Sequence, residues 1–136
     1  MLCRGIRGAT TVESNTREAI VEAARELLDA LVMANDVRTE DVASAYFTTT
    51  PDLNAEFPAV AARAHFGWTN VALMCGHEMS VPGSLQMCLR ILLHVNTDLA
   101  QHEIHHVYLR GAAALRPDLA RAPEPVGNSD HERHSR

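Results

Sequence analysis

The sequence of 136 residues contains no lysine, since its twelve basic residues are all arginines. This absence excludes a Schiff base on an internal lysine, covalent attachment of pyridoxal phosphate and the phosphate-binding lysine of a Walker-A loop. Arginine instead suits planar, bidentate recognition of carboxylates. The composition therefore directs attention to sites at which arginines meet carboxylate groups.

An excess of basic charge is also missing. The formal net charge is −5 and the pI is near 5.9, and no segment supplies the basic face that phosphate neutralisation requires, so we expect no nucleic-acid partner. No apolar run approaches the ~20 residues that span a bilayer, and no apolar signal segment follows the N-terminal charges. These features predict a soluble, cytoplasmic protein without a membrane partner.

Cysteine is scarce as well. Cys3, Cys75 and Cys88 are odd in number and lack C-x-x-C spacing, so neither a disulfide framework nor a zinc site is expected. We predict free thiols in a reducing cytoplasm. The histidines within residues 102–106 lack an evident carboxylate or thiolate to complete a metal shell, and those within residues 131–134 lie in a polar tail. We therefore predict no metal site.

Motifs for nucleophilic catalysis and phosphate binding are missing too, since the sequence has neither G-x-S-x-G nor G-x-G-x-x-G. Cys75 and His77 come nearest to a Cys-His pair. Two residues apart at a strand end, they need not face each other. The sequence thus offers no evident covalent catalyst.

The length fits one domain, which we assign to residues 1–120. From Arg121 onward the chain is rich in Pro, Gly, Asn, Ser, His and charge, and such a segment cannot bury enough apolar surface to order itself. Residues 121–136 are therefore predicted to form a flexible tail.

Within the domain, apolar periodicity and chain breakers predict strands at 2–12, 42–50, 70–75, 87–95 and 103–110, the last with an optional continuation to 115, and helices at 16–34 and 59–66. Asn15 is the predicted N-cap of the first helix, with Glu18 completing a capping box, and Gly67 is predicted to end the second.

The strand at 87–95 contains one residue that does not fit its apolar run, Arg90. A desolvated arginine without a partner costs several kcal/mol, so an anion must meet it. One candidate is a carboxylate of the protein, with Glu78 the nearest in sequence, and the other is a carboxylate or ether oxygen of a ligand. Glu78 follows the strand at 70–75 in a polar turn, where loops present functional groups on a rigid scaffold. The residues alone leave both alternatives open.

The first predicted strand places Arg7 on the same face as Gly5 and Ala9, because side chains alternate along a strand. Gly5 and Gly8 weaken a strand unless another backbone or a ligand must come close, which suggests a close approach beside Arg7. The alternative is a frayed edge strand whose arginines are solvated.

Several short motifs stand out in order along the chain. They are Arg4-Gly5-Ile6-Arg7-Gly8-Ala9-Thr10-Thr11, Thr50-Pro51-Asp52-Leu53, Phe57-Pro58-Ala59, His106-Val107-Tyr108-Leu109 and Leu115-Arg116-Pro117-Asp118-Leu119. Together they closely resemble the monofunctional AroH-type chorismate mutases, and the match runs without gaps from about residue 3 to residue 119.

The resemblance implies an α/β (mixed α+β) fold, with a mixed five-stranded β-sheet and helices on one side, in a homotrimer that forms a pseudo-α/β barrel with active sites between subunits. It also implies chorismate as substrate and prephenate as product, at the branch toward phenylalanine and tyrosine, without a metal or an organic cofactor. The reaction of these isomerases is a unimolecular Claisen rearrangement, in which an ether C–O bond breaks as a C–C bond forms. No acid, base or covalent step is required, so fixed charges and a well-held substrate conformation can supply the catalysis.

Carried over by position, the resemblance assigns Arg90 to the ether oxygen and the enolpyruvyl carboxylate. It assigns Arg7 and Tyr108 to the same carboxylate. Glu78 would accept a hydrogen bond from the ring hydroxyl and face the positive charge that develops on the ring. These four residues are the expected catalytic set.

A second set is expected to bind the substrate. It comprises the cleft walls Phe57, Ala59, Leu73 and Leu115, the backbone near Met74 and Cys75, and the mouth residues Arg63 and Arg116, which would steer a dianion inward. One departure from the family pattern is Val60, which stands where relatives often carry a lysine. Electrostatic capture of the substrate is therefore expected to be weaker.

Other interpretations remain open. Related small trimers include deaminases that act on enamines and imines, and a cleft with arginines could simply bind a small carboxylate. A structural domain without a ligand would leave Arg90 paired only to protein groups. A chorismate mutase requires Arg7, Glu78, Arg90 and Tyr108 together, and this requirement separates it from the alternatives.

Overall fold

A mixed five-stranded sheet organises the computed structural model, which describes residues 1–115. The strands are Leu2–Thr11 (β1), Val42–Thr49 (β2), Ala72–His77 (β3), Cys88–Thr97 (β4) and Val107–Tyr108 (β5), and the helices are Arg17–Asn35 (α1) and Val60–Phe66 (α2). Short 3-10 helices cover Thr39–Asp41 (η1), Gln101–Glu103 (η2) and Arg110–Leu115 (η3). The strand order is β3-β2-β4-β1-β5, in which β4 is antiparallel to β1 and β2, whereas β3 and β5 are parallel to their neighbours.

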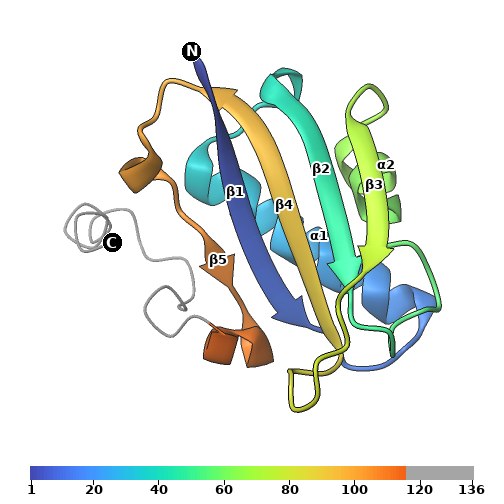
Figure 1. Cartoon of the computed structure of the whole chain (residues 1–136). Helices are drawn as coiled ribbons and strands as arrows, with labels where there is room; N and C mark the ends of the chain where they lie inside the picture. The colour runs from blue at the N-terminus through green and yellow to red at the C-terminus, as the bar shows by residue number, and fades with distance from the viewer. Residues whose placement is uncertain (116–136) are drawn as a thin grey trace.

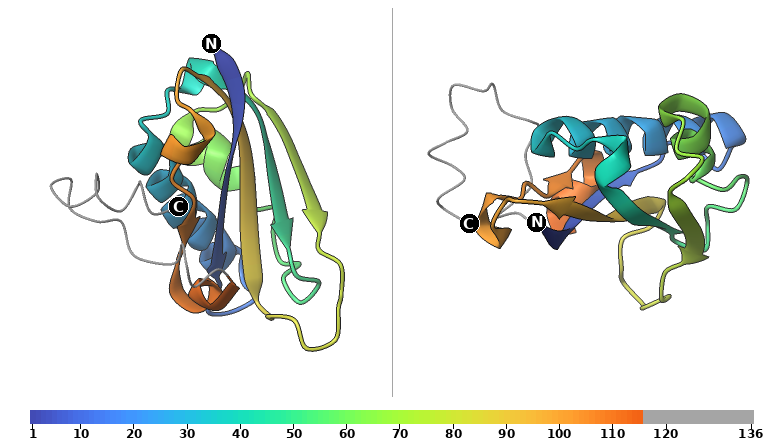
Figure 2. Two further views of the ribbon diagram at one scale, coloured as in Figure 1. Left: turned by 60° about the vertical axis from the view of Figure 1, so that its left-hand side comes forward. Right: turned by 90° about the horizontal axis from the view of Figure 1, so that it is seen from above.

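Helices α1 and α2 lie on the same face of the sheet (Figure 1 and Figure 2). The alternation of side chains explains this layering. Leu89, Ile91 and Leu93 of β4 are buried in the main core, whereas Arg90 and Leu92 point the other way and are partly buried. Neither α1 nor α2 covers this second face, which we call the open face (Figure 2). Beside β5, Ala112 of the short helix η3 packs against Ala9 and Cys88 of this face. The predicted mixed sheet with helices on one side is therefore confirmed.

Helix α1 packs closely against the sheet beside β1. Its buried apolar residues recur every three or four positions, as one face of a helix requires, and they are Ile20, Ala23, Ala24, Leu27, Leu28 and Leu31. At Gly8 of β1, an added Cβ atom would lie 2.8 Å from the Val107 carbonyl oxygen and 3.0 Å from Leu27 Cδ1. The close approach that the sequence suggested therefore exists at Gly8, where the chain's own backbone and helix make it.

The start of α1 differs from the prediction. Thr16 is the N-cap, and its side chain accepts a backbone hydrogen bond, so the assignment of Asn15 and Glu18 to a capping box is wrong. The Asn15 Oδ1 atom instead accepts from the backbone N–H groups of Asn54 at 2.9 Å and Ala55 at 3.0 Å. Both residue types cap helices well, and the local sequence could not show that the loop after β2 binds the asparagine.

The other elements lie within two residues of their predicted ends, except for the last strand. Gly67 ends α2 in the left-handed conformation, with φ of 66°, as expected. The prediction of a strand at 103–110 is wrong, because β5 is limited to Val107–Tyr108 and 3-10 helices flank it. At the N-terminal side Glu103 belongs to η2, and at the C-terminal side Arg110 has a φ of 50°, outside the β region. The tail predicted at 121–136 lies outside the described residues.

Candidate active site

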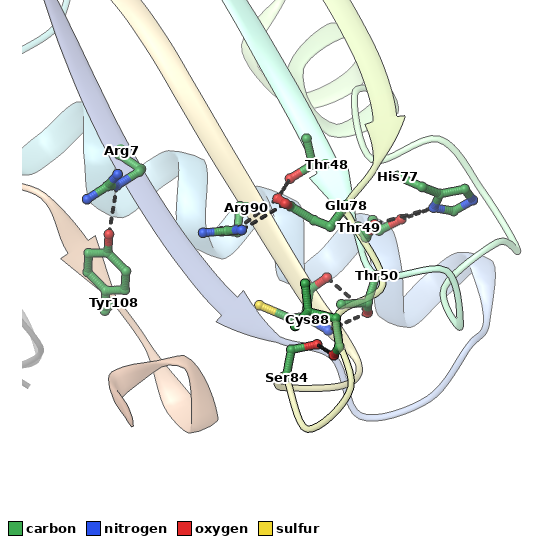
Figure 3. Close-up of polar contacts among 11 residues, drawn as sticks. Arg7, Thr48, Thr49, Thr50, His77, Glu78, Ser84, Cys88, Arg90 and Tyr108 are labelled. Atoms are coloured by element: carbon green, nitrogen blue, oxygen red, sulfur yellow. Dashed lines mark hydrogen bonds and ion pairs between the residues drawn. The ribbon is translucent and has the colours of Figure 1, made fainter. Parts of the chain in front are cut away.

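Arg90 of β4 forms an ion pair with Glu78 on the open face (Figure 3). Its Nε donates to Glu78 Oε2 at 2.8 Å and its Nη2 donates to Oε1 at 2.7 Å, which is the two-point geometry that arginine and carboxylate favour. The Arg90 side chain is 40% exposed and that of Glu78 is 22% exposed. The protein carboxylate considered as a partner for Arg90 is therefore confirmed, and the pair still presents surface to a ligand.

Glu78 comes directly after β3 and is held from two sides. Its backbone N–H donates to the Thr49 carbonyl at 2.8 Å, and the Thr48 hydroxyl donates to Glu78 Oε2. Partial burial alone raises the pKa of Glu78, but the hydrogen bonds from Arg90 and Thr48 outweigh this effect and hold the pKa below its ordinary value. The hydrogen bond to Glu78 raises the pKa of Arg90 in turn. Both side chains are therefore charged at neutral pH.

A second polar pair lies on the open face beside the first (Figure 3). Arg7 of β1 donates from Nε to the Tyr108 hydroxyl at 2.8 Å. Tyr108 is 2% exposed and clusters with Ala9, Cys88 and Ala112. Arg7 is only partly buried, so it is the more accessible member of the pair, and Tyr108 orients it.

The register of the sheet brings the two arginines together. Arg90 pairs with Ala9 across β4 and β1, and Arg7 lies two residues before Ala9 on the same face. Such diagonal neighbours have Cα atoms about 7–8 Å apart. Two guanidinium groups and one carboxylate thus share this part of the open face, which gives it a net positive charge suited to an anionic ligand.

Thr48 was not singled out from the sequence, although it contacts the Glu78 carboxylate. It lies opposite Arg90 in the pairing of β2 with β4, which brings its hydroxyl to the ion pair. A threonine within a strand is ordinary, so only the strand register could have revealed this role.

The predicted binding residues near β3 and α2 lie at the edge of the sheet opposite β5. Phe57, Arg63 and Met74 are exposed, Leu73 and Cys75 are partly buried, and Ala59 is buried. Burial raises the pKa of the Cys75 thiol. Within one chain, the structure brings Arg7, Glu78, Arg90 and Tyr108 together but leaves this second set at a distance from Tyr108.

Two predicted binding residues remain, Leu115 and Arg116, together with Val60, the departure from the family pattern. Leu115 ends η3 and is 38% exposed, and Val60 begins α2 with its side chain partly buried. Arg116 lies outside the described residues.

The chemistry available on the open face is electrostatic. Arg7, Glu78, Arg90 and Tyr108 can bind anions and donate or accept hydrogen bonds, but they include no nucleophile activated by a base. Among residues 1–115, no group of three or more His, Cys, Asp or Glu side chains could hold a metal ion. None of the helices in the same range combines the length and the apolar character of a membrane span.

Comparisons with known proteins agree with this geometry. The family model described as chorismate mutase type I matches residues 3–119. The chain is 46% identical to the chorismate mutase AroH of Bacillus subtilis (strain 168) over 120 residues, which cover 88% of this chain and 94% of that protein. It is 49% identical to the chorismate mutase AroH of Thermus thermophilus over 122 residues, which cover 89% of this chain and 99% of that protein.

A solved structure is similar as well. The chorismate mutase from Clostridium thermocellum matches with a TM-score of 0.80 and 50% sequence identity, and the match covers 82% of this chain and 98% of that chain. Sequence and structure thus agree over almost the whole length of these proteins. The chain therefore belongs to the chorismate mutase type I family.

Proposed function

We propose that this chorismate mutase rearranges chorismate to prephenate at a site centred on Arg90 and Glu78. The observation that carries the proposal is their two-point ion pair on the open face, with Arg7 and Tyr108 beside it. The reaction is an isomerisation at the branch toward phenylalanine and tyrosine. It depends on fixed charges and a held substrate conformation, and it requires neither a metal nor an organic cofactor.

Arg90 has donors left for the substrate. A guanidinium carries about five N–H groups, and Glu78 takes one from Nε and one from Nη2, so the others can reach a ligand. As the ether C–O bond breaks, negative charge builds on the ether oxygen. A cation fixed at that oxygen stabilises the transition state more than the substrate, and the ion pair with Glu78 keeps the guanidinium in position before the reaction begins.

Glu78 has an acceptor left for the ring hydroxyl. A carboxylate offers about four lone-pair sites. Oε2 receives hydrogen bonds from Arg90 and Thr48, whereas Oε1 receives one from Arg90, so Oε1 can accept another. Its negative charge also complements the positive character that the ring acquires as the ether bond breaks.

Arg7 and Tyr108 are proposed to bind the enolpyruvyl carboxylate. The Tyr108 oxygen accepts from Arg7 Nε, so the phenolic hydrogen remains available as a donor. Arg7 keeps its Nη groups for contact with the carboxylate. Binding the carboxylate in this way would hold the flexible arm over the ring in a near-attack geometry.

We further propose a homotrimer of the pseudo-α/β barrel type, with the substrate between subunits. In one chain Tyr108 and Met74 lie in strands at opposite edges of the sheet, and four spacings of ~4.8 Å separate these edge strands by roughly 19 Å. A single chorismate molecule does not span that distance. A second copy on the open face, where Tyr46 is 38% and Met74 is 64% exposed, would supply Phe57, Arg63 and Met74 to the site.

A cytoplasmic location fits the state of the cysteines. Cys3, Cys75 and Cys88 are all free thiols, and free thiols are typical of a reducing compartment. We therefore propose that the enzyme works in the cytoplasm.

A cofactor-free assay is the first test. Purified protein is mixed with chorismate without added metal or cofactor, the loss of ultraviolet absorbance is followed, and prephenate is identified by acid conversion to phenylpyruvate. We expect saturable turnover. A folded protein that leaves chorismate unchanged would contradict the proposed activity. Light scattering coupled to gel filtration tests the assembly separately, and a fully active monomer would contradict the site between subunits.

A further inference from the structure

The segment that carries Tyr108 has little strand pairing of its own. β5 contains two residues at the edge of the sheet and pairs with Gly8 and Ala9 of β1. One further backbone hydrogen bond joins the Leu109 N–H to the Ala9 carbonyl at 2.9 Å. So short a strand supplies few backbone hydrogen bonds, and side-chain contacts add to the support of Tyr108.

Asn35, the last residue of α1, provides such support. Its Oδ1 accepts from the His105 backbone N–H at 2.8 Å, and its Nδ2 donates to the His105 carbonyl at 2.8 Å. The side-chain amide thus binds both backbone polar groups of His105, as the backbone of a neighbouring strand would. Nδ2 also donates to the Leu31 carbonyl at 2.9 Å, which fixes the amide to the last turn of the helix.

Because Asn35 is buried, the loss of its hydrogen bonds should be costly. The residue is 8% exposed, and the loss of a buried hydrogen-bond partner costs more than the loss of an exposed one, because water does not readily replace it. Without the amide, the His105 backbone would lose both of these hydrogen bonds, and the chain before β5 would be held less firmly against α1.

His106, the residue after His105, joins the segment before β5 to Arg7. The Arg7 backbone N–H donates to His106 Nδ1 at 3.0 Å, while Arg7 Nε donates to the Tyr108 hydroxyl at 2.8 Å. Residues 105–108 therefore connect the end of α1 to both the backbone and the side chain of Arg7. A shift at His105 would be transmitted to the Arg7–Tyr108 pair.

We propose that Asn35 is a positioning residue for the reaction, which holds Tyr108 where its hydroxyl orients Arg7. The proposal rests on the proposed function, because it concerns the pair assigned to the substrate carboxylate. Asn35 belongs to the helical layer, on the other side of the sheet from the open face, so it acts through Tyr108 and does not touch the substrate.

A double-mutant cycle on chorismate turnover tests this role. Asn35→Ala should lower kcat/KM by roughly ten- to a hundredfold, the range for a displaced binding group, mainly through a higher KM because carboxylate binding weakens. In a Tyr108→Phe background the hydroxyl is already absent, so the same change should cost less than about threefold. Equal losses in the two backgrounds, or no loss from Asn35→Ala, would overturn the proposal.

A matched control is available in Thr39→Val. It removes another side-chain hydrogen bond of the helical layer, the one from Trp68 Nε1 to Thr39 Oγ1 at 3.2 Å, but it does not touch β5. This variant should leave kcat/KM unchanged in both backgrounds. A loss that matches that of Asn35→Ala would reduce the effect of Asn35 to general stability and overturn the positioning role.

A fluorine NMR measurement decides the question without relying on activity. The sequence has two tyrosines, Tyr46 and Tyr108, so fluorotyrosine labelling gives two resonances, which Tyr46→Phe assigns. Asn35→Ala should move the Tyr108 resonance and leave that of Tyr46 in place, and the proposal fails if neither moves or both move alike. Should Asn35→Ala not fold, Asn35→Asp, which keeps the shape but loses the donor, replaces it in both experiments.

The two measurements also separate this inference from the proposed function. Absence of turnover in the unmodified protein would contradict the activity alone, since the fluorine spectrum still shows whether Asn35 positions Tyr108. Normal turnover in the unmodified protein, together with a Tyr108 resonance that Asn35→Ala does not move, would contradict the positioning role alone.

Discussion

The guanidinium of Arg90 and the carboxylate of Glu78 meet at two points, 2.8 Å and 2.7 Å apart, on the face of the sheet that the helices leave open. The pair is not a buried core salt bridge, because the two side chains keep 40% and 22% of their surface exposed. An apolar strand thus presents a fixed cation instead of enclosing it. A cation held in this way is suited to negative charge that develops in a bound molecule.

Replacing Arg90 with alanine should remove most of the activity and leave the fold intact. We expect kcat to fall by about 10²–10³-fold, because removal of one preorganised donor typically costs about 3–4 kcal/mol of transition-state stabilisation. Arg25→Ala is the control, since it removes an exposed helical arginine paired with Glu22 and should not affect turnover. Near-normal activity of Arg90→Ala would contradict the role of this side chain.

Citrulline at position 90 separates charge from shape. It keeps the planar hydrogen-bonding group of Arg90 but carries no charge, so we expect an activity close to that of the alanine variant. The measurement is kcat of the semisynthetic protein. A rate equal to that of the unmodified enzyme would rule out the electrostatic explanation.

Thr48→Val should move the acid limb of the activity profile to higher pH. Partial burial raises the pKa of Glu78, whereas hydrogen bonds from Arg90 and Thr48 lower it, and the net pKa lies below the ordinary value of 4.5. Interactions of the ionised carboxylate are therefore fully present above that ordinary value and are lost as the pH falls through the depressed folded-state pKa. Without the Thr48 hydroxyl the folded-state pKa rises, so the loss begins at a higher pH.

The pH dependence of kcat/KM measures this shift. Ser84→Ala is a suitable control, because the Ser84 hydroxyl donates to the Val81 carbonyl within a loop and does not contact Glu78. Its acid limb should coincide with that of the unmodified enzyme. If the limb of Thr48→Val coincides as well, Thr48 does not tune the carboxylate.

Cys88 should resist thiol reagents in the native protein. Burial raises the pKa of this thiol to about 11, even though the nearby charge of Arg90 opposes the shift. The thiolate is the reactive form, and at pH 8 only about 0.1% of such a thiol is ionised. Mass spectrometry after brief alkylation should find Cys88 modified in the denatured protein and unmodified in the native one. Rapid native labelling would show that the thiol is neither buried nor neutral.

The elements with their own local pattern could be predicted from the sequence, and β5 could not. The aromatic and β-branched residues of β2, the apolar run of β4 and the apolar stripe of α1 identify their structure without tertiary contacts. β5 depends on residues distant in sequence, because Asn35 binds the backbone of His105 and the strand pairs with β1. Such contacts leave no periodic pattern, which explains why the prediction extended the strand too far.

The site residues likewise divide into those that the local sequence identifies and those that it does not. Arg90 could be singled out because it is a charge in an apolar run, and its partner Glu78 because it follows a strand end. Arg7 and Tyr108 owed their assignment to family resemblance, since an arginine near an N-terminus and a tyrosine in a short strand are ordinary. Thr48 gained its importance from the register opposite Arg90, and no local pattern encodes that register.

Gly8→Ala should destabilise the fold and disturb the site together. An added Cβ atom would lie 2.8 Å from the Val107 carbonyl oxygen and 3.0 Å from Leu27 Cδ1. The backbone oxygen cannot rotate away, so β5 or α1 must shift, and overpacking of this kind costs about 1–3 kcal/mol. Because β5 carries Tyr108, we expect kcat/KM of the folded variant to fall along with its Tm.

Gly5→Ala is the matched control on the same strand. A Cβ atom there would make an ordinary contact at 3.7 Å with a side chain of β4, so no element has to move. Thermal unfolding should therefore show a Tm lower by several degrees for Gly8→Ala than for Gly5→Ala. Equal Tm values would mean that α1 and β5 can separate at little cost, and the position of Tyr108 would then not depend on how closely the helix packs at Gly8.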